Sequence, residues 1–153
     1  MKVYLDNCSY NRPFDDQSQM RIYLETQAKL YIQLLIHNGN LLLAVSYVSR
    51  YENGNSPHLK SKITIEQFFG NAITYVDIDK ADLIEERANK IMNYGVKAKD
   101  ALHISCAIEA KCDYFITTDD GILRKYRTGD IEVCSPLEFI NIWEDFLCTT
   151  QQP

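Results

Sequence analysis

The chain has 153 residues, of which 46% are hydrophobic and 24% charged, values typical of one soluble globular domain. No apolar run approaches the roughly 18 residues that a membrane span needs, and the N-terminus has no apolar leader, so we expect a cytoplasmic protein with no membrane partner. The formal net charge of -5 argues against a nucleic-acid partner, because phosphate contacts require basic side chains.

Five short apolar runs alternate with longer periodic segments. The runs that we expect to form strands cover residues 3–5, 41–45, 72–76, 114–117 and 131–134. They are brief and show no polar alternation, as expected of strands buried on both faces of a parallel sheet. The pattern predicts a three-layer α/β fold in a single domain over residues 1–147, followed by a C-terminal tail over residues 148–153.

Apolar residues at helical spacing predict helices between these strands. The three stripes are Leu24, Ala28, Tyr31 and Leu35; then Ile84, Ala88 and Ile91; then Ala101, Ile104 and Ile108. Gly39, Gly70 and Gly95 follow helical stretches, where a left-handed C-cap is expected. Ser135 and Glu138, with Pro136 between them, form a capping-box pattern that predicts the start of a last helix.

The cysteines are expected to be reduced and mostly buried. Their number is odd and no two of them form a C-x-x-C pair, which argues against a disulfide framework and against a zinc site. The five positions are Cys8, Cys106, Cys112, Cys134 and Cys148.

Acidic residues fall at the ends of predicted strands. Asp6 directly follows the first strand, Asp119 comes two residues after the fourth, and Asp100 opens the helix that leads into the fourth. Glu52 lies on the segment after the second strand, about two helical turns beyond Ser46. In an open parallel sheet, ligands bind beyond the carboxyl ends of the strands, where the strand order reverses. We therefore expect these acids to form one cluster.

Such a cluster requires either protons or a divalent cation. Two carboxylates about 5 Å apart repel each other by roughly 3 kcal/mol at an effective dielectric constant near 20. Oxygen ligands without a thiolate or imidazole suit Mg²⁺ or Mn²⁺, which can activate water and orient a phosphodiester. Withdrawing four acids from the 21 leaves 17 against 16 Lys and Arg, so the charge objection to a nucleic-acid partner weakens.

Each acid also has a plain structural interpretation, which for Asp6 is a turn residue. Asp100 could be a first-turn acid stabilised by the helix dipole, and Asp119 could be the N-cap of the segment that follows it. Asp120 is more often a cap than a ligand at such a position, although we include it among the candidate metal ligands. Glu52 could be a solvated helix residue.

Four basic residues are candidates for contacts with a substrate. His103 lies one helical turn beyond Asp100 and could orient a carboxylate or a phosphate, or be a hydrogen-bonded structural histidine. Arg12, Lys97 and Lys99 flank the expected cleft in sequence and could contact backbone phosphates or remain solvated.

Four segments of the chain resemble the PIN domain family, whose members are Mg²⁺- or Mn²⁺-dependent ribonucleases and include the toxins of VapBC-type toxin-antitoxin pairs. The segments are "VYLDNC", "SRYEN", "AKDALHISCAIEAKCDYFITTDD" and "VCSPLEFI", and they span nearly the whole chain in the right order. The most specific part is the D-A-L-H helix followed by a strand that ends in T-x-D. The resemblance implies a five-stranded parallel sheet in the order 3-2-1-4-5 and a metal-binding, catalytic quartet at Asp6, Glu52, Asp100 and Asp119.

The resemblance implies an endoribonuclease that binds Mg²⁺ or Mn²⁺, cleaves RNA and leaves 5′-phosphate and 3′-hydroxyl ends. It further implies a cognate antitoxin as a partner and a homodimer, which is common in the family. Many members carry a hydroxyl residue where this chain has Cys8, so the supporting hydroxyl is expected from Ser9 or Thr117. The alternative is a catalytically inactive PIN-like module that binds RNA or protein, but its mark, a missing acid, is absent. A phospho-acceptor domain would need a lysine after the fifth strand, where this chain has Ser135 and Pro136.

Overall fold

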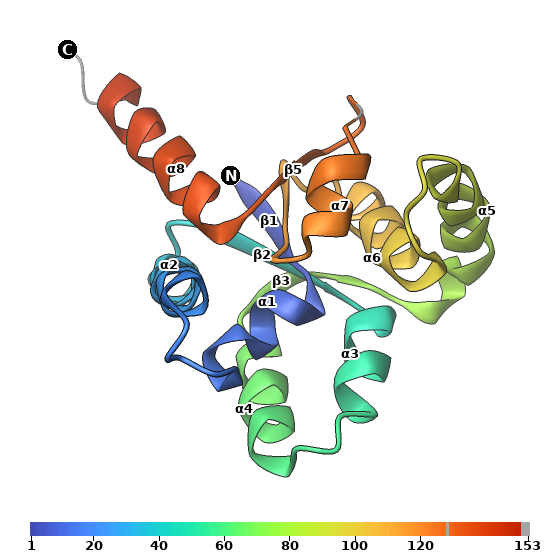
Figure 1. Cartoon of the computed structure of the whole chain (residues 1–153). Helices are drawn as coiled ribbons and strands as arrows, with labels where there is room; N and C mark the ends of the chain where they lie inside the picture. Colours follow the sequence, from blue (N-terminus) through green and yellow to red (C-terminus); the bar gives the residue numbers. More distant parts are fainter. Residues whose placement is uncertain (128, 151–153) are drawn as a thin grey trace.

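Five parallel strands form one sheet in the order β3-β2-β1-β4-β5 (Figure 1). The structure is a computed structural model that describes residues 1–127 and 129–150. The strands are β1 (Lys2–Leu5), β2 (Leu42–Ser46), β3 (Ala72–Val76), β4 (Tyr114–Ile116) and β5 (Glu132–Cys134). The predicted sheet order is confirmed, and every predicted strand matches within one residue at each end.

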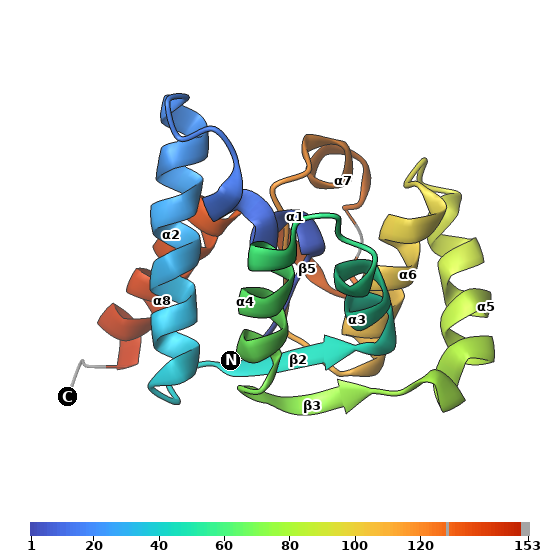
Figure 2. The ribbon, with the colours of Figure 1, turned by 90° about the horizontal axis from the view of Figure 1, so that it is seen from below.

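The segments between the strands are helical. The α-helices are α1 (Asn7–Asn11), α2 (Met20–His37), α3 (Tyr47–Gly54), α4 (Leu59–Phe69), α5 (Ala81–Met92), α6 (Ala98–Glu109), α7 (Asp120–Lys125) and α8 (Pro136–Thr150), with 3-10 turns η1 (Arg12–Phe14) and η2 (Ile78–Lys80). Helices α2 and α8 lie at one side of the molecule, and α5 and α6 lie at the other (Figures 1 and 2). The three-layer α/β fold is therefore confirmed.

Consecutive residues of β1 point into two different cores. Val3 and Leu5 pack with Ile32 of α2 and other buried residues on one face of the sheet. Tyr4 packs on the other face with residues that include Ile104 of α6. Both faces are covered at β1, which explains why this strand lacks polar alternation. The expectation of burial on both faces is wrong for the edge strand β3, where Ile73 and Tyr75 are 62% and 43% exposed.

The strand order reverses at β1. The chain runs from β1 through β2 to β3 on one side and then crosses over to β4 and β5 on the other. Tyr4 lies in register with Ala44 of β2 and with Phe115 of β4. The carboxyl ends of these three central strands therefore lie together at the switch point of the sheet, where ligands bind in folds of this kind.

The predicted apolar stripe of α2 is only half correct. Ala28 and Leu35 are buried, but Leu24 and Tyr31 are 43% and 38% exposed. The helix carries apolar residues on all of its sides, so their spacing in the sequence does not single out one buried face. The buried face instead includes Glu25, which forms ion pairs with two arginines.

The ends of the helices agree with most of the predictions. Gly39 and Gly95 have φ angles of 77° and 83°, as expected of left-handed C-caps, whereas the prediction for Gly70 is wrong because its φ is -61°. The amide of Ser135 donates to the Glu138 carboxylate at 2.7 Å and the amide of Glu138 donates to the Ser135 hydroxyl at 3.2 Å, which confirms the capping box.

Helix α8 continues through Thr150, so residues 148–150 are helical, and the rest of the predicted tail, residues 151–153, lies outside the described residues. All five cysteines are free, and three of them are buried. Over residues 1–127 and 129–150, no helix has the length and apolar character required to cross a bilayer.

Candidate active site

Asp6 is held at the carboxyl end of β1 by neighbours on two elements. Its carboxylate is buried, and it accepts hydrogen bonds from the Asn7 amide at 2.7 Å and from the Thr117 hydroxyl at 2.8 Å. The Cys8 thiol lies 3.1 Å from the same carboxylate. Burial, followed by the negative charge of Asp6, raises the pKa of Cys8 to about 12, so Cys8 acts as a neutral donor. Thr117 therefore supplies the expected hydroxyl.

Asp119 is connected to Asp6 through Thr117. The hydroxyl that donates to Asp6 also accepts a hydrogen bond from the Asp119 amide at 3.0 Å. The Oδ1 atom of Asp119 caps α7 by accepting from the amides of Gly121 at 2.6 Å and Ile122 at 3.3 Å. The N-cap interpretation is thus correct. No hydrogen bond from a described residue reaches Oδ2, which leaves that oxygen available to a ligand.

Asp100 lies in the first turn of α6, half-buried and close to the other acids. Burial raises the pKa of Asp100, and the charges of Asp6 and Asp119 raise it further, while His103 and Lys97 act in the opposite direction. Three carboxylates from three separate elements therefore lie within electrostatic reach of one another.

Glu52 is fixed from two sides on α3. Its Oε1 lies 2.6 Å from the Lys99 ammonium, and its Oε2 lies 2.6 Å from Nε2 of His103. Burial opposes ionisation of Glu52, but the hydrogen bonds from His103 and Lys99 outweigh it and lower the pKa to about 2. Glu52 is therefore a carboxylate at neutral pH.

His103 lies behind Glu52 and not in the path of a substrate. Only 1% of it is exposed, so the predicted contact with a phosphate is not available, whereas the predicted contact with a carboxylate is present. Nδ1 of His103 lies 2.9 Å from the Tyr4 hydroxyl, which in turn lies 2.7 Å from the hydroxyls of both Ser46 and Ser49. A buried chain of hydrogen bonds thus connects the sheet to Glu52.

Arg12 is engaged in ion pairs away from the acid cluster. Its Nε lies 2.9 Å from the buried carboxylate of Glu25, and its Nη1 lies 3.0 Å from Asp15. The predicted phosphate contact by Arg12 would require these ion pairs to break.

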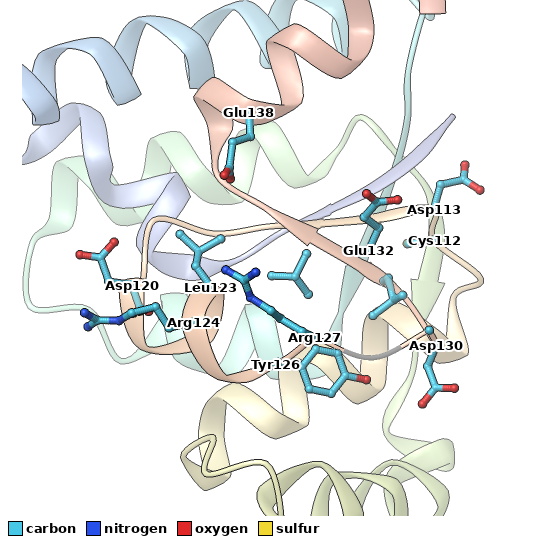
Figure 3. Close-up of a pocket in the computed structure, with 13 residues that line it drawn as sticks. Cys112, Asp113, Asp120, Leu123, Arg124, Tyr126, Arg127, Asp130, Glu132 and Glu138 are labelled. Atoms are coloured by element: carbon cyan, nitrogen blue, oxygen red, sulfur yellow. Dashed lines mark hydrogen bonds between the residues drawn. The ribbon is translucent and has the colours of Figure 1, made fainter.

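Asp120 does not join the acid cluster. It is exposed, and its two oxygens accept hydrogen bonds from Arg21 at 2.6 and 2.8 Å. Figure 3 shows Asp120 in a groove along α7 and β5, together with Arg124 and, further along, Glu138. The prediction of Asp120 as a metal ligand is therefore replaced by an ion pair with Arg21.

Three of the remaining acids line two separate hollows. Glu52 and Lys99 line a groove that also contains Asn7, Tyr51 and His58. Asp100 and Asp119 line a smaller pocket together with Lys97 and Lys125. Each hollow thus places positive side chains beside carboxylates, a combination suited to a phosphate bridged to a metal ion.

The donor atoms fit a hard divalent ion, although their side chains do not converge fully. Among residues 1–127 and 129–150, no three His, Cys, Asp or Glu side chains are close enough to hold a metal ion together. The carboxylates of Asp6 and Asp119 are anchored by hydrogen bonds, whereas the side chain of Asp100 makes no hydrogen bond to another described residue. Carboxylate oxygens in this number match the preference of Mg²⁺ or Mn²⁺.

The sequence alone did not identify Tyr4, Ser46 and Ser49 as part of this site. Tyr4 stands in an apolar strand and was interpreted only as a strand residue. A signal was present, because the hydroxyl of a tyrosine in a buried strand usually finds a hydrogen-bond partner. The partners lie more than 40 residues away, on β2, α3 and α6, and become adjacent to Tyr4 only in the folded chain.

The protein is thus a three-layer α/β domain with carboxylates at the switch point of a parallel sheet.

No protein-family model matches the sequence, and no curated protein matches it either. Among solved structures, the chain is similar to VapBC2 from Rickettsia felis bound to a DNA fragment from their promoter and to FitAcB from Neisseria gonorrhoeae. Both have a TM-score of 0.54 at 15% identity, over 88% of this chain and 98% of the other.

DNA-bound VapBC from Salmonella typhimurium is also similar, with a TM-score of 0.50 at 15% identity, over 89% of this chain and 98% of the other. The chain therefore has the PIN-like fold that the sequence resemblance implied, shared with chains of VapBC complexes. An identity of 15% establishes the fold and leaves the activity to be argued from the site.

Proposed function

We propose that the protein is a metal-dependent endoribonuclease. The carrying observation is the position of the acids: Asp6 and Asp119 are linked through the Thr117 hydroxyl just beyond the carboxyl ends of β1 and β4. In agreement with this placement, burial and the charges of Asp6 and Asp119 raise the pKa of Asp100. Both observations indicate carboxylates gathered at the switch point of the sheet, with a repulsion that a divalent cation would relieve. Glu52, the fourth acid of the PIN pattern, lies on α3, which contacts both α1 and α6.

Asp6, Glu52, Asp100 and Asp119 would hold Mg²⁺ or Mn²⁺, which would supply an activated water and neutralise charge on the phosphate. The residues of this chain supply the positions. Thr117 holds Asp6 and Asp119 at a fixed separation, and His103 orients Glu52. Lys97, Lys99 and Lys125 lie beside the acids, where they can bind the RNA backbone through its phosphates.

The direct test is cleavage of a panel of labelled RNA oligonucleotides. We expect cleavage with Mn²⁺ or Mg²⁺ and none with EDTA. The products should have 5′-phosphate and 3′-hydroxyl ends, because the attacking group would be water activated by the metal and not the neighbouring 2′-hydroxyl of the RNA. Cleavage that resists EDTA, or products with 2′,3′-cyclic phosphates, would contradict the proposal. RNA binding without cleavage would favour the inactive PIN-like module.

We also propose that an antitoxin binds to the exposed side of α2. Tyr23, Leu30 and Leu34, at spacings of seven and four residues along the helix, are 46%, 44% and 51% exposed. An apolar stripe of this kind is typical of a protein interface, and the similar solved structures include VapBC complexes.

Leu34→Glu should lower the affinity for the proposed antitoxin by about tenfold or more, because it places a charge in an apolar interface. Affinity can be measured with the two purified proteins. Leu83→Glu on α5, where the leucine is 42% exposed, is the matched control and should leave the affinity unchanged. Equal affinities of the two variants would place the interface elsewhere.

A further inference from the structure

Lys99 is the cation closest to the acid cluster for which the structure gives a direct contact. Its ammonium lies 2.6 Å from Oε1 of Glu52. The hydrogen bond to Glu52 raises the pKa of Lys99 against the opposing effect of burial, and the charges of Asp100 and Asp6 raise it further. One ammonium group thus interacts with three of the four carboxylates of the proposed site.

The two oxygens of Glu52 have partners that differ in burial and in flexibility. Oε2 is bound by His103, which is 1% exposed and is held from behind by Tyr4. Oε1 is bound by Lys99, whose side chain is 63% exposed and ends a flexible four-carbon stem. Of the two partners, only Lys99 can leave without disturbing the core. Oε1 is therefore the atom of Glu52 that can be released to a metal ion.

We propose that Lys99 is an internal counter-ion of the acid cluster, which a divalent metal must displace before Glu52 can bind that metal. The inference rests on the proposed metal-dependent function. The 2.6 Å contact with Lys99 occupies Oε1, so a metal ion would have to replace this contact in order to bind that oxygen. Once displaced, the ammonium, whose side chain is 63% exposed, would be available to an RNA phosphate.

The opposite role would be a support for Glu52, comparable to that of His103. The two roles predict changes of opposite sign when the lysine is removed. A support stabilises the metal-bound arrangement, so its loss weakens metal binding. A competing counter-ion stabilises the metal-free arrangement, so its loss strengthens metal binding.

The experiment is a Mn²⁺ titration of the full chain without RNA, with the dissociation constant taken from the rise in the unfolding midpoint above the EDTA value of each variant. Lys99→Met should bind Mn²⁺ about threefold to fivefold more tightly than wild type, as expected from loss of a partly exposed ion pair. Lys97→Met, the matched control, removes one positive charge near Asp100 without touching Glu52 and should give less than half that effect. Lys99→Arg, which keeps the charge on Glu52, should restore the wild-type constant.

Weaker binding by Lys99→Met, or binding no tighter than that of Lys97→Met, would overturn the counter-ion role while leaving the metal site intact. A wild-type protein whose midpoint does not respond to Mn²⁺ would overturn both this role and the proposed function. The two failures are therefore distinguishable in one titration series.

Discussion

Asp100→Asn should reduce metal-dependent RNA cleavage by about 100-fold or more and at the same time stabilise the metal-free protein. The loss follows because a metal-binding carboxylate is replaced by a neutral amide, and removal of even an outer partner of a metal ligand costs about 10- to 100-fold. The gain follows because burial and the charges of Asp6 and Asp119 disfavour the ionised form of Asp100. Relief of repulsion between partly exposed groups is worth up to about 1 kcal/mol.

Thermal unfolding of wild type and Asp100→Asn, each with EDTA and with Mn²⁺, measures both effects. The variant should have the higher midpoint in EDTA, and the order should reverse in Mn²⁺, because only the wild type gains from binding. Two outcomes would remove Asp100 from the site: full cleavage by the variant, or the same response to Mn²⁺ in both proteins.

Asp120→Asn is the control variant for Asp100→Asn, because it removes an acid that lies outside the proposed metal site. Asp120 is exposed and bound to Arg21, so its replacement should leave the response to Mn²⁺ unchanged. It should change the free energy of unfolding only slightly, because a surface ion pair contributes little to stability. A variant of Asp120 that no longer responds to Mn²⁺ would return this residue to the proposed metal ligands.

The sheet could be predicted because its local and global signals agree. Residues 72–76 form an apolar run bounded by helical segments, and the structure has β3 at the same positions. Helix α2 could not be predicted to the same degree. Its buried face includes Glu25, whose charge is compensated by Arg12 and Arg21, and such compensation depends on tertiary contacts that spacing does not reveal.

The site divides in the same way. Asp6 and Asp119 could be located by counting from strand ends, because parallel strands bring their carboxyl ends to one edge. Asp120, one residue further along, has the same local pattern but turns to Arg21, a contact across almost 100 residues of chain. The roles of Lys99 and His103 also required the structure, because both depend on the distance between α3 and α6.

The largest stability effect is expected for Tyr4→Phe, and the chain contains its own control in Tyr10. Both side chains are fully buried, and burial raises the pKa of both hydroxyls. They differ in hydrogen bonding. The Tyr4 hydroxyl has three partners, whereas that of Tyr10 has none among the described residues.

The three partners of Tyr4 fill the capacity of its hydroxyl and orient His103. Glu52 is ionised and can only accept, so Nε2 of His103 must donate to it. In a neutral imidazole Nδ1 is then an acceptor, which requires the Tyr4 hydroxyl to donate to it and to accept from Ser46 and Ser49. Tyr4 thereby fixes the tautomer of His103 that presents a donor to Glu52.

Tyr4→Phe should therefore lower the free energy of unfolding by about 2 kcal/mol, because it leaves buried polar groups without a partner, and weaken Mn²⁺ binding by about tenfold. Tyr10→Phe removes a hydroxyl without a partner and should leave both quantities unchanged or raise stability slightly. Denaturant unfolding and Mn²⁺ titration of the two variants measure these effects. If Tyr4→Phe loses stability but binds Mn²⁺ as wild type does, the hydrogen-bond chain supports the core alone. If Tyr4→Phe loses both stability and Mn²⁺ affinity while Tyr10→Phe loses neither, the hydrogen bonds from Tyr4 through His103 fix the position of Glu52. The carboxylates at the switch point are then positioned by buried polar contacts as well as by the ends of the strands.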